Sequence, residues 1–309
     1  MACAYSLLQK GLVGELVLAD VMKDKLKGEV MDLQHGGAYQ HGRIVECDDD
    51  YEASRNSDIC IIAAGVRQQD GETRLQLADR NRDVLKHIIP PLVAKSPNTV
   101  ILMVSNPVDI MTYIAWQLSG LPANRVLGSG TFLDSSRFRT LIGQELDVNA
   151  SSVHAWIVGE HGDSSVPVWS SVNIAGVHLD TSHSANFDKI HERVVSAAYD
   201  VIKLKQKGYL CPYQSRFLPH RQGYTNWAIG SAVSTLCGII LQNQQRVVPV
   251  STYVKGVHGI DESVFLSLPC VLGSRGVERI LHQPLDDKEL QSLQSSAKNL
   301  WAVQKDIKF

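Results

Sequence analysis

The sequence lacks the features that mark several large classes of protein. Its 30 lysine and arginine residues nearly balance its 32 aspartate and glutamate residues, so no excess of positive charge is present to bind nucleic acid or an anionic membrane surface. Its 6 cysteines have the spacing of neither a disulfide framework nor a zinc site, which favours a reduced, cytoplasmic compartment and no metal. The cysteines are Cys3, Cys47, Cys60, Cys211, Cys237 and Cys270.

A long apolar run that could cross a membrane is also missing. Residues 223–245 carry no charge and are long enough, but they contain several polar side chains, so a buried helix is expected there. The N-terminus has no charged region followed by a sustained apolar one, so no secretory signal is expected. The length of 309 residues, 44% of them hydrophobic, predicts a globular protein of about two domains.

What the sequence does contain is an alternation of strand-like and helix-like segments in its N-terminal part. Apolar runs typical of strands occur at residues 16–19, 59–64 and 100–105. Segments typical of helices follow them, at residues 23–35, 74–95 and 109–118. Such alternation predicts a parallel sheet, and near-continuous apolar strands suit a sheet that helices cover on both faces.

The strands of this predicted sheet end in small or polar residues, namely Asp20, Gly65 and the segment 105–107. Ligands bind outside the carboxyl ends of parallel strands, so these three segments point at one crevice. After about Gly130 the pattern changes to shorter strands mixed with helices, which predicts a second domain of α+β type. Its expected strands and closing helix lie at residues 153–158, 247–255, 264–272 and 286–304.

Asp20 stands where a Rossmann-type unit places a carboxylate that accepts hydrogen bonds from the adenosine ribose of a dinucleotide. In that unit a first strand and a Gly-x-Gly-x-x-Gly turn precede the helix before Asp20. No such strand precedes the helix expected over residues 2–8, and the Gly-x-Gly at residues 128–130 lies far downstream. We therefore expect an incomplete Rossmann-type parallel sheet without its first strand, with unpaired backbone groups beside the gap and weakened dinucleotide binding. The expected domains are a dinucleotide-binding domain over 1–129 and a substrate domain over 130–309.

Three short segments carry candidate chemical groups. His161 lies between glycines after an apolar strand and could both give and take a proton at neutral pH, although an isolated histidine is more often structural. Asp134 and Arg137 lie one helical turn apart, and a local ion pair is the alternative explanation for them. The polar segment 65–74 directly follows a strand, so it is either a mobile lid over a site or an ordinary solvated loop.

In their order along the chain, these segments resemble the L-lactate dehydrogenases of the lactate and malate dehydrogenase superfamily, from Met1 to Phe309. The matching strings are Asp32-Leu33-Gln34-His35-Gly36, Val104-Ser105-Asn106-Pro107-Val108-Asp109, Leu133-Asp134-Ser135-Ser136-Arg137, Gly159 to Ser165, and Gly223 to Gly230. The resemblance implies NAD as the cofactor, pyruvate and L-lactate as substrates, and no metal. It also implies a cytoplasmic homotetramer of glycolysis and carboxylic acid metabolism.

The resemblance also implies roles for individual residues. It makes His161 the proton donor and acceptor, with Asp134 orienting its imidazole. Arg137 would grip the substrate carboxylate as a bidentate fork, and Arg74 would polarise the reacting carbonyl. Asn106 would bond near that carbonyl and near the nicotinamide.

Further implied roles concern the cofactor and the choice of substrate. Asp20 would hold the adenosine ribose and repel the 2'-phosphate of NADP, Arg67 would approach the cofactor phosphates, and Thr225 would line the substrate pocket. Malate dehydrogenases of the superfamily have arginine at the position of Gln68, where it pairs with a second substrate carboxylate. A neutral glutamine leaves such a dianion uncompensated, so pyruvate and lactate fit better than oxaloacetate and malate.

The chain departs from the family at residues 206–222, an insertion that contains Pro212 and Pro219 and therefore cannot continue a helix. If the insertion forms an exposed bulge, it costs little loop entropy and is tolerated. Because it lies just before Thr225, however, we expect it to damage the substrate pocket. The family's N-terminal arm, which supports the tetramer, is also without a counterpart, and assembly is in doubt. Two classes of function stay open: an L-lactate dehydrogenase, or an inactive relative that acts only by association with intact subunits.

Overall fold

The computed structural model describes residues 1–66, 74–179, 187–207 and 225–309. The first part of the chain alternates between strands and helices as predicted. Its elements are α1 (Ala2–Gln9), β1 (Glu15–Leu18), α2 (Lys23–His35), β2 (Arg43–Glu46), β3 (Ile59–Ile62), α3 (Arg74–Lys95), β4 (Val100–Met103), α4 (Val108–Ser119) and β5 (Val126–Gly128). The three strands predicted from apolar runs and the three helices predicted between them are confirmed to within a few residues.

The later part of the chain contains shorter strands and longer helices. Its elements are α5 (Phe132–Glu145), β6 (Val153–His154), β7 (Ile157–Gly159), β8 (Ser165–Pro167), β9 (Asn173–Ile174), β10 (Val177–His178), α6 (Asp188–Lys207), α7 (Trp227–Leu241), β11 (Arg246–Tyr253), β12 (Phe265–Gly273), β13 (Gly276–Ile280) and α8 (Asp287–Gln304). The strand expected over 153–158 is in fact two strands, because β6 pairs with β9 whereas β7 pairs with β8 and β12.

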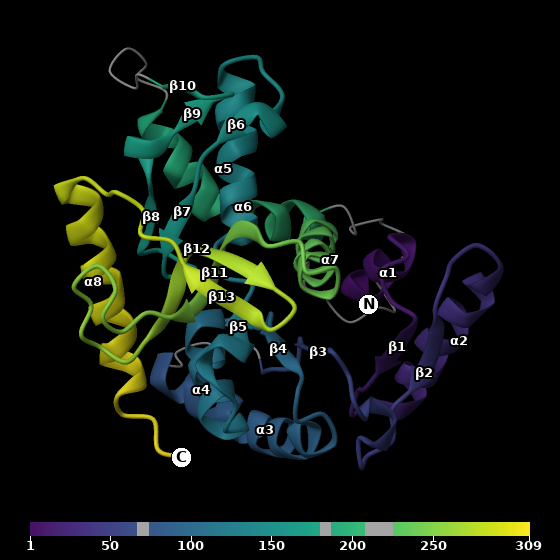
Figure 1. Cartoon of the computed structure of the whole chain (residues 1–309). Helices are drawn as coiled ribbons and strands as arrows, with labels where there is room; N and C mark the ends of the chain where they lie inside the picture. The colour runs from purple at the N-terminus through teal and green to yellow at the C-terminus, as the bar shows by residue number, and fades with distance from the viewer. Residues whose placement is uncertain (67–73, 180–186, 208–224) are drawn as a thin grey trace.

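The sheet of the first part is broken between β1 and β3. β1 and β2 form a parallel pair by themselves, and β3 begins a separate eight-stranded sheet in the order β3-β4-β5-β11-β12-β7-β8, with β13 beside β12. Within the described residues, no strand pairs with both β1 and β3. The expected incomplete parallel sheet is therefore what the structure has (Figure 1).

The two predicted domains share one mixed sheet, which the sequence did not indicate. β3, β4 and β5 are parallel, and β5 then pairs antiparallel with β11 through Gly128 and Ser251. A Cβ on Gly128 would lie 2.9 Å from the Ser251 side chain, so this close approach of the two strands requires glycine. The junction brings α4, at the end of the first part, next to the strands of the second.

Helices cover both faces of this sheet. On one face α3, α4 and α8 bury residues such as Leu85, Ile114 and Leu293, and on the other α1 and α7 bury Leu7 and Leu236. Every residue of β12 is buried, which explains its continuous apolar run instead of an alternating one. Figure 1 shows α8 and the β1–β2 pair on opposite sides of the molecule.

The uncharged stretch 223–245 contains α7, which is a buried helix as predicted. Nine of its residues are buried, among them Leu236 and Ile240, and it packs along α1. Gly230 permits this contact, because a Cβ there would lie 2.8 Å from the Ala2 carbonyl oxygen. Lys10, just after α1, donates to the Thr235 hydroxyl at 2.9 Å and fastens the same pair of helices. None of the helices in the described ranges is both long enough and apolar enough to cross a membrane.

Candidate active site

Among the predicted site residues whose side chains the structure describes, His161 and Asp134 form the closest contact. His161 follows β7, Asp134 lies in the first turn of α5, and the His161 Nδ1 and Asp134 Oδ2 atoms are 2.5 Å apart. Only 8% of the Asp134 side chain and 23% of the His161 side chain are exposed. The N-terminal end of α5 also favours a negative charge at this position. The pair can therefore hold an imidazole in one orientation and stabilise it when it is protonated.

Arg137 contacts the second oxygen of the same carboxylate. Its Nη1 atom lies 2.8 Å from Asp134 Oδ1, so the ion pair expected from their spacing is present. Because Asp134 also bonds to His161, the local ion pair and the catalytic interpretation are both compatible with this geometry. A guanidinium has five N–H groups, so a contact through Nη1 leaves others for a substrate carboxylate.

The electrostatic environment of this cluster favours charged forms of both partners. Burial by itself lowers the pKa of His161, but the neighbouring Asp134 carboxylate outweighs it and holds that pKa above its ordinary value. Burial likewise opposes ionisation of Asp134, but His161 and Arg137 together hold the pKa of Asp134 below its ordinary value. Groups with shifted pKa values of this kind are typical of sites that transfer protons.

Asp109 contacts the backbone of His161 and was not among the predicted site residues. It is buried at the start of α4, and its Oδ2 atom accepts the backbone N–H of His161 at 2.7 Å. Within the described part of the chain, no group forms a hydrogen bond of good geometry with its Oδ1 atom. The nearby Ser251 hydroxyl nevertheless lowers the pKa of the Asp109 carboxyl. Burial raises the pKa of Asp109 to about 7, against smaller lowering effects from Ser251 and His161. Little in the sequence indicated this role, because an acid in the first turn of a helix is common at any helix N-terminus.

Asn106 and Thr225 lie beside elements of the site but do not bond to its centre. Asn106 is exposed after β4, and its peptide bond to Pro107 is cis. Thr225 is partly buried shortly before α7. No hydrogen bond in the described segments joins either residue to His161.

The predicted cofactor residues are only partly covered by the structure. Asp20 is exposed after β1, and its Oδ1 atom accepts the Met22 N–H at 2.9 Å. Arg67 and Gln68 lie outside the described residues. Arg74 is the first residue of α3, and its side chain is likewise not described.

Asn81 fixes the chain at the start of the segment predicted to be a lid. It is fully buried in α3, and its Oδ1 atom accepts the Val66 N–H at 2.9 Å. The same oxygen lies 2.9 Å from where a Cβ on Gly65 would be, so glycine is needed for this approach. Sequence reasoning did not identify Asn81, since one asparagine in a long polar helix gives no distinctive pattern.

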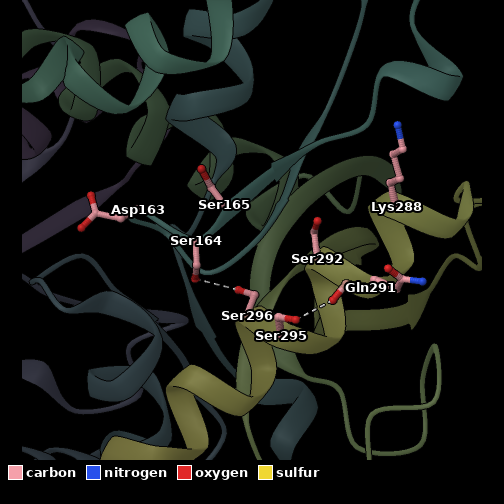
Figure 2. A pocket seen from close by; sticks show the side chains of 8 residues that line it. All are labelled: Asp163, Ser164, Ser165, Lys288, Gln291, Ser292, Ser295 and Ser296. Carbon is pink, nitrogen blue, oxygen red and sulfur yellow. Dashed lines mark hydrogen bonds between the residues drawn. The ribbon is translucent and has the colours of Figure 1, made fainter. Parts of the chain in front are cut away.

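An open, polar cavity of about 560 Å³ lies beside the loop that carries His161, between that loop and α8 (Figure 2). Its lining residues are Asp163, Ser164, Ser165, Lys288, Gln291, Ser292, Ser295 and Ser296. None of the predicted catalytic or substrate-binding residues lines it. The cavity is therefore a neighbour of the His161 cluster and not the predicted substrate site.

Comparison with known proteins places this geometry in a family. Residues 1–128 match the NAD binding domain of lactate/malate dehydrogenase, and residues 131–308 match the alpha/beta C-terminal domain of the same family. The L-lactate dehydrogenase B chain of the lizard Sceloporus undulatus is 53% identical, over 100% of this chain and 89% of the relative. The human B chain is 51% identical over 100% and 90%, and the A chain of the zebrafish Danio rerio is 50% identical over 99% and 90%. The chain therefore belongs to the lactate/malate dehydrogenase family of oxidoreductases, with NAD as its cofactor.

Proposed function

We propose that the chain is an NAD-dependent L-lactate dehydrogenase that interconverts pyruvate and L-lactate. The observation that carries this proposal is the contact of His161 and Arg137 with the two oxygens of Asp134, at 2.5 and 2.8 Å. This arrangement unites a proton carrier, its counter-ion and a carboxylate-binding cation, as reduction of a 2-keto acid needs. The identity of about half of the residues with named L-lactate dehydrogenase chains supports the same function.

His161 acts in this proposal as the proton donor and acceptor. Its Nδ1 atom is held by Asp134, so Nε2 is the atom that exchanges a proton with the substrate oxygen at C2. Asp134 keeps the ring oriented and stabilises the imidazolium that precedes proton donation. The Asp134 carboxylate raises the pKa of His161, which favours the protonated imidazole that reduction of pyruvate needs.

Arg137 grips the substrate carboxylate, and Arg74 polarises the reacting carbonyl. Asn106 bonds near the carbonyl, and Thr225 lines the pocket. Gln68 leaves the pocket without the positive charge that a second substrate carboxylate would need, which favours pyruvate over oxaloacetate.

The residues at the carboxyl ends of the strands fit NAD in part. Asp20 presents an exposed carboxylate after β1, as the adenosine ribose hydroxyls need, and it disfavours a 2'-phosphate. Arg67 would approach the phosphates, and Asn106 the nicotinamide. Bound NADH would supply the hydride that reduces C2 of pyruvate. The division into domains at residues 1–129 and 130–309 belongs to this proposal, as do a role in glycolysis, a cytoplasmic location and a homotetramer.

A second candidate is an inactive relative that associates with intact subunits. The break between β1 and β3 favours it, because a parallel sheet interrupted beside a cofactor site leaves backbone groups without strand partners. This alternative keeps the His161 cluster but predicts that cofactor affinity is lost.

The test is a measurement of NADH binding by calorimetry together with pyruvate-dependent NADH oxidation by the purified chain. His161→Gln should lower kcat/KM by about 10² to 10⁴, as expected for a general acid-base group. The matched control is His154→Gln, which changes an exposed histidine in β6 and should leave the rate unchanged. An absence of both NADH binding and turnover in the unchanged chain would favour the inactive relative, whereas turnover that survives His161→Gln would overturn the assigned mechanism.

A further inference from the structure

Two consecutive backbone amides at the catalytic histidine are held by side chains from two different helices. The Glu160 N–H donates to the Ser296 hydroxyl oxygen at 2.9 Å, and the His161 N–H donates to Asp109 Oδ2 at 2.7 Å. Ser296 belongs to α8 and Asp109 to α4. The loop between β7 and β8 is therefore fixed from both sides at the residue that carries the imidazole.

Ser296 also bonds to the far end of the same loop. Its Oγ atom lies 3.1 Å from that of Ser164, and the Ser164 hydroxyl donates in turn to the Glu160 carboxylate. Figure 2 shows the contact between Ser164 and Ser296, both of which line the polar cavity. Since Ser296 is fully buried, water cannot easily replace it as a partner for the Glu160 amide.

Both helices are well anchored themselves. α8 begins with a capping box in which Asp286 accepts the Glu289 N–H at 2.8 Å, and the Glu289 carboxylate also accepts the Ser170 N–H at 2.9 Å. Its Leu293 and Leu300 are buried against the sheet. α4 is buried along most of its length, including Ile114. Rigid supports of this kind let a single hydrogen bond define the position of a loop.

We propose that Ser296 and Asp109 are positioning residues for His161, which hold the backbone of its loop so that the imidazole meets both Asp134 and the substrate. The inference rests on the proposed role of His161 in proton transfer. A displacement of about 1 Å at a reacting group can lower a rate on the order of a hundredfold, so loss of either amide partner is large enough to measure.

Asp109 has an additional electrostatic effect that Ser296 lacks. The charged groups that face His161 are Asp134 and Arg137 from α5 and Asp109 from α4, and Glu160 faces Asp109 from the same loop. When Asp109 is ionised, its negative charge adds to that of Asp134 in stabilising the imidazolium, and because burial raises the pKa of Asp109 to about 7, this effect grows as the pH rises through neutrality. Asp109→Asn keeps an oxygen that can accept the His161 N–H but removes the charge, so it separates the two effects.

The first experiment compares Ser296→Ala with Ser295→Ala. Ser295 is the adjacent residue in α8, but it is exposed, and its hydroxyl donates to the Gln291 carbonyl within its own helix (Figure 2). Ser296→Ala should lower kcat for pyruvate reduction roughly tenfold or more, with little change in KM for NADH, and should speed hydrogen exchange at the Glu160 amide. Ser295→Ala should change neither. Equal exchange rates at Glu160 in both variants would overturn the role of Ser296.

The second experiment measures pH dependence in Asp109→Asn. Reduction of pyruvate needs protonated His161, so kcat/KM falls as the pH rises through the pKa of His161. Asp109→Asn should move this fall to lower pH, whereas Ser296→Ala should leave its midpoint in place. Circular dichroism and thermal unfolding of each variant establish that the fold is retained.

A titration of His161 by NMR separates this inference from the proposed function. The imidazole signal is assigned with His161→Gln, and its midpoint is then compared between the unchanged chain and Asp109→Asn, without substrate or cofactor. A lower midpoint in Asp109→Asn supports the role of Asp109 even in a chain that does not reduce pyruvate, and such a result would count against the proposed function alone. An unchanged midpoint would overturn the electrostatic effect of Asp109 on His161, whatever the activity.

Discussion

Asp134→Asn is the change that tests the His161 cluster most directly. The Asp134 carboxylate bonds to His161 at 2.5 Å and to Arg137 at 2.8 Å, and only 8% of its side chain is exposed. The amide keeps the size of the side chain and one acceptor oxygen but removes the negative charge that both partners face. The variant therefore leaves two cationic groups near each other with no carboxylate between them.

The expected effect on the rate follows from the value of one buried, charge-assisted hydrogen bond. Such a bond contributes about 1.5 to 3 kcal/mol, and each ~1.4 kcal/mol changes a rate tenfold. Loss of the His161 contact should therefore lower kcat/KM for pyruvate by about ten- to a hundredfold. The pKa of His161 should also fall, because the Asp134 carboxylate is what holds it above its ordinary value.

The effect on stability should depend on pH. His161 has a raised pKa, so its contribution is fully present below its ordinary value of 6.5 and is lost as the pH rises through the folded-state value. Asp134 has a lowered pKa, so its contribution is present above its ordinary value of 3.8 and is lost as the pH falls through the folded-state value. The destabilisation by Asp134→Asn should thus be largest between about pH 4 and pH 6.5, and smaller at alkaline pH.

The assay combines initial rates of NADH oxidation with urea unfolding at about pH 5.5, 7 and 9. Asp147→Asn is the matched control, because it removes an exposed carboxylate just after α5 and should alter neither quantity. A rate within about threefold of the unchanged chain, together with a stability difference that is the same at all three pH values, would refute the assignment of Asp134 as the counter-ion of His161.

Four further changes have defined outcomes. Gly230→Ala forces α1 away from α7 and should lower the free energy of unfolding by about 1–3 kcal/mol, whereas Gly28→Ala, with nothing within 4 Å of the new Cβ, should raise it by about 0.5–1 kcal/mol in urea titrations. Gln68→Arg should move the ratio of kcat/KM values toward oxaloacetate, and an unchanged ratio would contradict the substrate assignment. Deletion of residues 206–222 should raise kcat/KM for pyruvate with little change in NADH affinity, and unchanged pyruvate kinetics would identify the segment as a tolerated surface loop.

The structure gives one observation that bears on that last outcome. Lys205 near the end of α6 donates to the Asn226 side chain at 2.5 Å, although the two residues are 21 positions apart in the sequence. The end of α6 is therefore tied by this hydrogen bond to the residue just before α7. Residues 208–222 themselves lie outside the described part of the chain, so the expected damage to the pocket stays a prediction.

The secondary structure could be predicted from the sequence because its signals are local. Apolar runs of four to six residues bounded by glycine, proline or acids identified β1, β3 and β4, and the uncharged run identified α7. The pairing of β5 with β11 could not be predicted, since it joins Gly128 to Ser251 across more than a hundred residues and leaves no periodic pattern. The single mixed sheet was missed for this reason.

In the candidate site, too, contacts between residues close in the sequence could be predicted, whereas contacts between distant residues could not. The Asp134–Arg137 pair follows from helical spacing, whereas the contact of Asp134 with His161, 27 residues away, was implied only by resemblance to a family. Ser296 was missed because a serine on the buried face of an amphipathic helix gives no sign of the loop that it meets. Asp109 was part of a recognised string, yet its role depends on a backbone N–H, which no side-chain pattern records.

The positions of these elements imply that cofactor binding and proton transfer can fail independently in this chain. The elements that support His161 are α4, α5, α8 and β7. Asp109 and Asp134 bond to His161 itself, and Ser296 accepts the N–H of the preceding residue, Glu160. The β1–β2 pair that carries Asp20 lies across the molecule from α8 (Figure 1). A weakness in the interrupted sheet would therefore reduce affinity for NADH while leaving the imidazole correctly held. It follows that a low overall rate says little about the His161 cluster, and that the titration of His161 must be measured separately from cofactor affinity.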